Sequence, residues 1–423
     1  MMPLIFALSI FTLTFYLIIS GKLDKTIASL SGALAMVVCG LCLGFYSQEE
    51  AFSAIDFNMM GLLTGMMVIV SVCKKTGFFS FVAIKAAKAS GGSPLRLLVM
   101  MGGITAVLSM FLDNVTTIIL IIPITILICD ILGISPLPIV LSEIVLSNIG
   151  GAGTMIGDPP NMMIASSADL SFGDFIIHLM PIVLVSIVLA LIVLVILFRK
   201  EIAKPPRDFR PISEIDERAA VRDIKSLQKV ALSLVVVFAL FAVQKRFHLH
   251  HSFISLLGAG IVIILVRPNV SEIMKDIEWT ILIFFASLFI LIGGLEKTGL
   301  LDMIAERMVT LATINLSLAK ITLLWVSAVG ASLIDRIPFT TAMIPVIRHV
   351  GELGIETGSL WWILALGVGF GGNGTPIGSI VGIVGLAMSE KTHAPINFKI
   401  WFKTATIVML VTIIFVSLLI RFI

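Results

Sequence analysis

A polar, glycine-rich segment interrupts the most apolar part of this chain and limits what the chain can fold into. It runs from Ser147 to Asn161 and includes Asp158, and only about a dozen apolar residues separate it from the preceding turn near Pro136. A membrane-spanning helix needs roughly 20 apolar residues, so the break is expected inside the membrane. Backbone at that depth is tolerated without helix partners only where it is buried in protein or lines a wet cavity. The segment is therefore predicted to be a binding site.

Composition supports a membrane protein. Hydrophobic residues make up 58% of the 423 residues and charged residues 13%, whereas soluble proteins contain about 25% charged residues. The four cysteines, Cys39, Cys42, Cys73 and Cys129, all lie in apolar segments, which is typical of packing thiols and not of a disulfide framework. The pattern excludes a soluble domain, and no nucleic-acid partner and no metal site are predicted.

The second half of the sequence repeats the first. The matched pairs are Asp56 and Glu278, Lys75 and Lys297, Asp113 and Asp335, and Pro123 and Pro345, each 222 residues apart. Gly153-Thr154 recurs as Gly374-Thr375 at a shift of 221. Internal repeats of this kind are typical of secondary transporters, whose binding site lies between the repeats near the membrane midplane.

The repeat predicts an all-α polytopic membrane protein with two inverted repeats, residues 1–198 and 230–423, joined by a basic linker at 199–229. Each repeat is expected to contain about five crossings, a re-entrant helical hairpin (95–129 and 318–347) and an interrupted helix (137–168 and 359–388). Segments 77–90 and 299–312 are predicted to be interfacial helices. Most of the 29 lysines and arginines, Lys22 and Lys25 among them, then fall on one side. The positive-inside tendency makes that side cytoplasmic and places both termini outside, in what is predicted to be a bacterial inner membrane.

The candidate binding residues lie at the hairpin tips and the helix breaks, because these positions offer hydrogen-bonding side chains or close backbone approach. In the first half they are Asn114, Thr116, Thr117, Asn148, Gly150, Gly151, Gly153, Thr154 and Asn161. In the second half they are Arg336, Thr340, Asn373, Gly374, Thr375 and Ser379. A guanidinium at the second tip needs a counter-charge, which Asp335, Asp113 or Asp158 could supply.

Four carboxylates are candidates for proton coupling: Asp113, Glu143, Asp158 and Asp335. A carboxylate at membrane depth is costly and usually faces a pathway or a partner. Asp158 has Ser379 as its repeat equivalent, so it is a titratable group without a symmetric copy. The alternative for Asp113 and Asp158 is a purely structural role as helix N-caps.

The motifs Asp113-Asn114-Val115-Thr116-Thr117, Ser147-Asn148-Ile149-Gly150-Gly151, Gly157-Asp158-Pro159-Pro160-Asn161 and Gly371-Gly372-Asn373-Gly374-Thr375 resemble those of the ion transporter superfamily, in the clade of ArsB/NhaD-type permeases and the P protein. The resemblance implies a homodimer with an elevator-like movement and antiport of arsenite and antimonite, or of sodium, against protons. In some relatives a soluble ATPase is a partner. Arg336 departs from the asparagine expected at the second tip, which puts a second sodium site in doubt.

The predicted binding residues favour three candidate substrates in the following order. Proton-coupled export of arsenite or antimonite comes first, because an uncharged triol suits Asn, Thr and Asp ligands and the cysteines lie away from the motifs. Sodium–proton exchange is the first alternative, and transport of a dicarboxylate or another anion at Arg336 is the second. The coupling ion is predicted to be H⁺, or alternatively Na⁺, and no cofactor is expected. An intramembrane aspartyl protease would need a Tyr-Asp pair, yet the tyrosines are Tyr16 and Tyr46. A passive channel stays open as an alternative.

Overall fold

The computed structural model describes residues 2–20, 22–203, 212, 214, 216–390 and 392–422. The described chain is helical, because a helix satisfies its own backbone polar groups where lipid offers no partners. Ten of the described helices are long and apolar enough to cross a membrane. The predicted all-α polytopic class is confirmed.

The two halves contain the same series of elements. The first half consists of α1 (Met2–Ser20), α2 (Lys25–Leu43), α3 (Gln48–Ser53), α4 (Phe57–Lys75), α5 (Phe78–Ala89), α6 (Pro94–Phe111), α7 (Asn114–Leu132), α8 (Leu137–Gly151), α9 (Pro159–Ala168), α10 (Phe172–His178) and α11 (Met180–Leu197). The second half consists of α14 (Ile224–Phe247), α15 (His251–Val266), α16 (Val270–Asp276), α17 (Trp279–Glu296), α18 (Leu300–Ile314), α19 (Leu316–Ile334), α20 (Arg336–Glu352), α21 (Gly358–Gly371), α22 (Ile380–Ser389), α23 (Phe398–Phe402) and α24 (Ala405–Leu419). Element by element, α1 to α11 correspond to α14 to α24.

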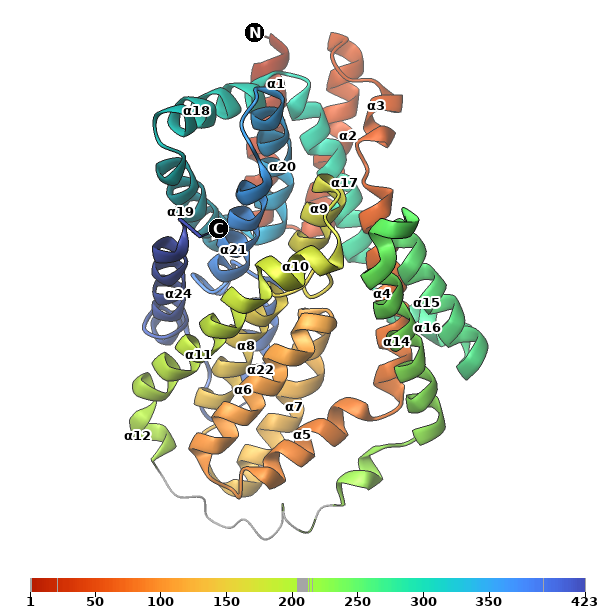
Figure 1. Ribbon diagram of the computed structural model, residues 1–423, viewed down its shortest axis with the longest axis vertical. Coiled ribbons are helices and arrows are strands. Elements are labelled where there is room, and N and C mark those ends of the chain that lie inside the picture. The colour runs from red at the N-terminus through yellow and green to blue at the C-terminus, as the bar shows by residue number, and fades with distance from the viewer. Residues whose placement is uncertain are drawn as a thin grey trace.

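The halves run in opposite directions. In Figure 1 α1 begins at the top of the molecule and α14 begins at the bottom, and α5 and α18 lie across opposite ends. The hairpin α6–α7 enters from the bottom and the hairpin α19–α20 from the top, so that their tips point toward the middle. This is the inverted arrangement of hairpins that the sequence predicts.

The halves are also interlocked. Helix α2 packs on α17 of the other half, and α4 packs on α15. The hairpin helix α6 packs on α8, and its counterpart α19 packs on α21. Each interrupted helix therefore packs on the hairpin of its own half. The surrounding helices α2 and α4 pack on helices of the other half.

Two predicted boundaries were wrong. The first break is shorter than Ser147–Asn161, because α8 continues to Gly151 and α9 begins at Pro159. The linker 199–229 ends early, because Asp223 accepts a hydrogen bond from the Ser226 amide and starts α14 at Ile224. Before α14 the linker contains α12 (Arg199–Ile202) and the 3-10 helix η1 (Glu217–Ala220). The linker prolines Pro205, Pro206 and Pro211 lie outside the described residues.

Candidate functional site

The centre of the molecule is formed by the two hairpin tips and the two helix breaks. Asp113 lies immediately before α7 and Asp335 immediately before α20. Asp158 precedes α9 and Ser379 precedes α22. Four helix N-termini therefore begin near the middle, each with a polar residue at its N-cap position. This places backbone amides and side-chain oxygens together in an otherwise apolar core.

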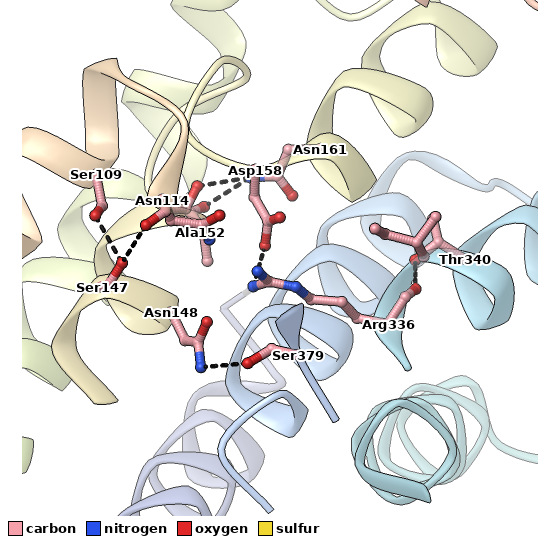
Figure 2. A network of polar contacts seen from close by, with 12 residues as sticks. Ser109, Asn114, Ser147, Asn148, Ala152, Asp158, Asn161, Arg336, Thr340 and Ser379 are labelled. Atoms are coloured by element: carbon pink, nitrogen blue, oxygen red, sulfur yellow. Dashed lines mark hydrogen bonds and ion pairs between the residues drawn. The ribbon is translucent and has the colours of Figure 1, made fainter. Parts of the chain in front are cut away.

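A buried ion pair connects the two halves at this centre. The Arg336 Nη1 atom lies 2.5 Å from the Asp158 Oδ2 atom, and the two side chains are 2% and 1% exposed. Figure 2 shows the guanidinium pointing from the start of α20 at the carboxylate before α9. Asp158 is therefore the carboxylate, among the three candidates for a counter-charge, that contacts Arg336. Removing either member of a buried pair leaves an uncompensated charge, so the two residues depend on each other.

A second polar contact between the halves lies beside the ion pair. The Asn148 amide donates to the Asn373 Oδ1 atom at 2.8 Å and to the Ser379 hydroxyl at 3.1 Å. Asn373 in turn donates to the Val145 carbonyl at 3.2 Å. Figure 2 shows Asn148 reaching from α8 to Ser379. The two asparagines thus join α8 to the second break.

Several buried polar atoms at the centre have no hydrogen-bond partner in the described chain. They are both amide atoms of Asn114, the Oδ1 atoms of Asn148 and Asp158, and the Nε atom of Arg336. The Asn114 amide lies beside the Asp158 carboxylate, close enough for a weak hydrogen bond, and its Nδ2 atom is 3.1 Å from where a Cβ on Gly151 would be. An unpartnered buried polar group costs about 1–3 kcal/mol. Five such atoms around one ion pair are typical of a binding site, where a solute supplies the missing partners.

Other predicted ligands are already engaged by the protein. Thr154 donates to the Met110 carbonyl and accepts from the amides of Ile156 and Gly157. Thr375 does the same with the Ser332 carbonyl and the Ile377 and Gly378 amides. Both threonines fasten a break to the hairpin of its own half.

Asn161, Thr116, Thr117 and Thr340 are also engaged. The Asn161 amide donates to the carbonyls of Thr154 at 2.8 Å, Ala152 at 3.1 Å and Gly151 at 3.4 Å. Thr116 donates to the Asp113 carboxylate, and Thr117 and Thr340 donate to backbone carbonyls one turn earlier. These hydroxyls and this amide hold the break and the hairpin tips in shape.

The predicted glycines allow close backbone packing. A Cβ on Gly150 would lie 2.3 Å from the Ala106 carbonyl oxygen, and one on Gly374 would lie 2.0 Å from the Ser332 hydroxyl. A Cβ on Gly153 would lie 3.1 Å from the Gly150 carbonyl oxygen. Each break therefore lies directly on its hairpin.

Of the other candidate carboxylates, Asp113 belongs to the centre and Glu143 does not. Asp113 caps α7 by accepting from the Thr116 amide at 2.8 Å, and with Arg336 it lines a cavity of about 10 Å³, the size of about one water molecule. Glu143 is fully buried between α7 and α8, where it accepts from the Thr125 hydroxyl at 2.5 Å. Asp335 pairs with Lys25, whose ammonium lies 3.0 Å away. Lys25 was not among the predicted site residues.

Two larger cavities flank the centre, and their walls are repeat equivalents. The first cavity, about 70 Å³, is lined by Met67, Val70, Ser71, Lys74, Ile119 and Glu278, among others. The second cavity, about 390 Å³, is lined at the corresponding positions by Phe289, Ile292, Gly293, Glu296, Thr341 and Asp56. The second cavity is the larger of these two.

This fold and this site define a polytopic membrane transporter of the inverted-repeat type. The sequence profile of the citrate transporter family (CitMHS) matches residues 15–369. The chain therefore belongs to the CitMHS family, within the ion transporter superfamily that the motifs predicted.

The relatives agree with this assignment. An uncharacterized transporter of Mycobacterium bovis is 39% identical over 96% of this chain and 95% of its own length. The 46 kDa membrane protein of Mycobacterium leprae is 40% identical over 93% of this chain and 92% of its own length. The human P protein is 31% identical over 94% of this chain and 57% of its own length, which confirms the predicted kinship with that clade.

A solved structure shows the same fold. The YdaH transporter of Alcanivorax borkumensis, described as having an unusual topology, aligns with a TM-score of 0.63. The alignment covers 94% of this chain and 97% of the YdaH chain at 14% sequence identity. The likeness concerns the arrangement of helices.

Proposed function

We propose that this chain is a proton-coupled antiporter that exports a small uncharged oxyacid of the arsenite or antimonite type. The observation that carries the proposal is the set of unpartnered buried atoms at the centre. Three of them are hydrogen-bond acceptors, on Asn114, Asn148 and Asp158, and two are donors, on Asn114 and Arg336. A solute with several hydroxyl groups both donates and accepts, so it can satisfy acceptors and donors together.

The coupling follows from the free oxygen of Asp158. As a carboxylate, Asp158 accepts a hydroxyl of the solute through Oδ1 while Oδ2 stays with Arg336. Protonation turns one of these acceptors into a donor and weakens the pair with Arg336. The solute and the proton therefore compete for the same carboxylate. Competition for one site that faces the two sides in turn produces antiport.

Arg336 favours a second candidate, the transport of an anion, with citrate as the first solute to test because of the family description. An anionic solute would take Arg336 from Asp158, and Asp158 would then need a proton. Solute and proton would bind together, which gives symport. Sodium exchange is disfavoured because the guanidinium occupies the place beside Asp158. The predicted homodimer, elevator movement and ATPase partner stay predictions.

The test is transport by the purified protein in proteoliposomes with an imposed proton gradient and a pH-sensitive dye. Arsenite or antimonite, added separately, is expected to dissipate the gradient in the direction of antiport. The Asp158→Asn variant is expected to lose this activity, whereas Asp130→Asn, an exposed carboxylate on α7, is expected to keep it. Dissipation by citrate in the symport direction, with no response to arsenite, would establish the second candidate instead.

A further inference from the structure

Lys25 is joined to the tip of the second hairpin. It is the first residue of α2, and its Nζ atom lies 3.0 Å from the Asp335 Oδ2 atom, 310 residues away in the chain. The Asp335 side chain is 1% exposed and the Lys25 side chain 29% exposed. Helix α2 is also fixed at this point to α17, since the Thr26 hydroxyl donates to the Thr280 carbonyl at 3.2 Å.

Asp335 differs from its repeat equivalent in its backbone. Its φ is 115°, whereas Asp113 at the first tip has a φ of −55°. A positive φ at a residue other than glycine costs about 1–3 kcal/mol and persists only where the surroundings hold it. The Asp335 Oδ1 atom accepts from the Ile337 amide at 3.2 Å, and Oδ2 is held by Lys25. Both Asp335 carboxylate oxygens therefore have partners other than Arg336.

Four of the charges at the centre form two crossed pairs, and Asp113, which lines the small cavity with Arg336, is the fifth. Lys25 of the first half meets Asp335 of the second, and Asp158 of the first half meets Arg336 of the second. Asp335 directly precedes Arg336 in the chain. Without Lys25, a buried carboxylate lacking its cation would lie beside the guanidinium and compete with Asp158 for it.

We propose that Lys25 is a positioning residue that directs Arg336 to Asp158 by neutralising Asp335. The ammonium can remain charged because it lines a cavity of about 510 Å³, bounded also by Val115 and Ile380 at the starts of α7 and α22. Lys25 touches neither Asp158 nor the unpartnered atoms of the site. Any effect of Lys25 on transport rests on the proposed function. The effect of Lys25 on the Asp158–Arg336 pair is independent of the proposed function.

The test is a set of double-mutant cycles measured by unfolding of the purified protein in detergent. The coupling between Asp158 and Arg336 is obtained from Asp158→Asn, Arg336→Gln and the double variant. This coupling is expressed as a ratio of unfolding equilibrium constants. We expect the ratio to fall about tenfold when the same cycle is measured in the Lys25→Met background. Adding Lys25→Met together with Asp335→Asn should restore it, because the competing carboxylate is gone. Lys22→Met is the matched control and should leave the coupling unchanged, because Lys22 is exposed and contacts Tyr16.

An unchanged coupling in Lys25→Met, or a lost coupling in the charge-neutral Lys25→Met/Asp335→Asn background, would overturn the proposal. If Lys25→Met alone does not fold, folding of Lys25→Met/Asp335→Asn with the coupling intact shows that Lys25 acts through Asp335 as proposed, and failure of both variants to fold overturns the proposal. Transport in proteoliposomes is then measured separately. Wild-type protein that moves none of the tested solutes would refute the proposed function while leaving the coupling result intact.

Discussion

At the scale of single residues, the two prolines that follow Asp158 explain why its carboxylate is available to Arg336. It occupies the N-cap position of α9 but makes no capping hydrogen bond, unlike Asp113 before α7 and Ser379 before α22. Pro159 and Pro160 follow it, and proline has no amide hydrogen to be capped. The carboxylate is therefore free to turn to Arg336. The structural alternative for this residue, a simple N-cap, does not describe its side chain.

The first prediction concerns this ion pair. Asp158→Asn should lower the stability of the folded protein by about 3–5 kcal/mol, because it removes the carboxylate that contacts the buried Arg336. Arg336→Gln combined with Asp158→Asn should recover much of that loss. Thermal unfolding in detergent measures both. A double variant less stable than either single variant would show that the pair is not the reason for the loss.

The second prediction separates two asparagines. Asn161→Ala should cost about 1–3 kcal/mol, because the Asn161 amide donates to three carbonyls of the break. Asn114→Ala should cost less stability than Asn161→Ala, because its amide makes no hydrogen bond of normal geometry and lies only beside the Asp158 carboxylate, yet it should weaken solute binding. The measurements are thermal unfolding and the solute concentration at half-maximal transport. Equal stability losses in the two variants would contradict the division into supporting and solute-facing residues.

At the scale of elements, the interrupted helices depend on their hairpins. Gly150 lies against the Ala106 carbonyl, and its counterpart Gly371 would place a Cβ 2.6 Å from the Ala328 carbonyl oxygen. Thr154 and Thr375 then tie each break to the end of the same hairpin. Hairpin and interrupted helix thus form one packed unit in each half, and the site lies where the two units meet.

The third prediction tests this packing. Gly150→Ala should destabilise the protein, because the added methyl group meets backbone that cannot move without shifting α6. Gly103→Ala is the control, since a Cβ at Gly103 in α6 meets nothing within 4 Å. It should be neutral or stabilising by up to about 1 kcal/mol, because alanine favours helix over glycine. The comparison is made by thermal unfolding, and equal effects of the two substitutions would argue against the close approach.

At the scale of the whole molecule, the inverted repeat creates two cavities whose lining residues correspond to each other. Their volumes are about 70 Å³ and 390 Å³, and the smaller cavity shares Ile119 and Glu278 with the cavity of about 510 Å³ beside Lys25. Thr341 in the wider cavity corresponds to Ile119 in the narrower one. The two positions therefore report on the two sides of the site.

The fourth prediction uses these positions in a background where Cys39 and Cys42 are replaced by alanine. A cysteine replacing Thr341 should react with a membrane-impermeant thiol reagent from the outer side, and a cysteine replacing Ile119 should react from the inner side. The orientation comes from the positive-inside tendency of the basic residues. Labelling of Thr341→Cys from the cytoplasmic side alone would reverse the assigned topology. A cysteine replacing Asp208 in the linker is predicted to react only from the cytoplasm, and this position lies outside the described residues.

The sequence by itself determined the helical membrane class, the repeat, the hairpins and the approximate position of the breaks, but not that α8 continues to Gly151. Those features depend on hydrophobic length, on glycine and proline, and on matched spacing, all of which are local or periodic. It also placed Asp158, Asn148, Asn373 and Arg336 at the centre. The choice of Asp158 as the partner of Arg336, the engagement of Thr154 and Asn161 by backbone, and the link from Lys25 to Asp335 were decided only by the tertiary structure. Each of these contacts joins groups on different elements, and several join the two halves. Which donor lies beside which acceptor depends on how the helices of the two halves pack, and a sequence pattern does not predict that packing.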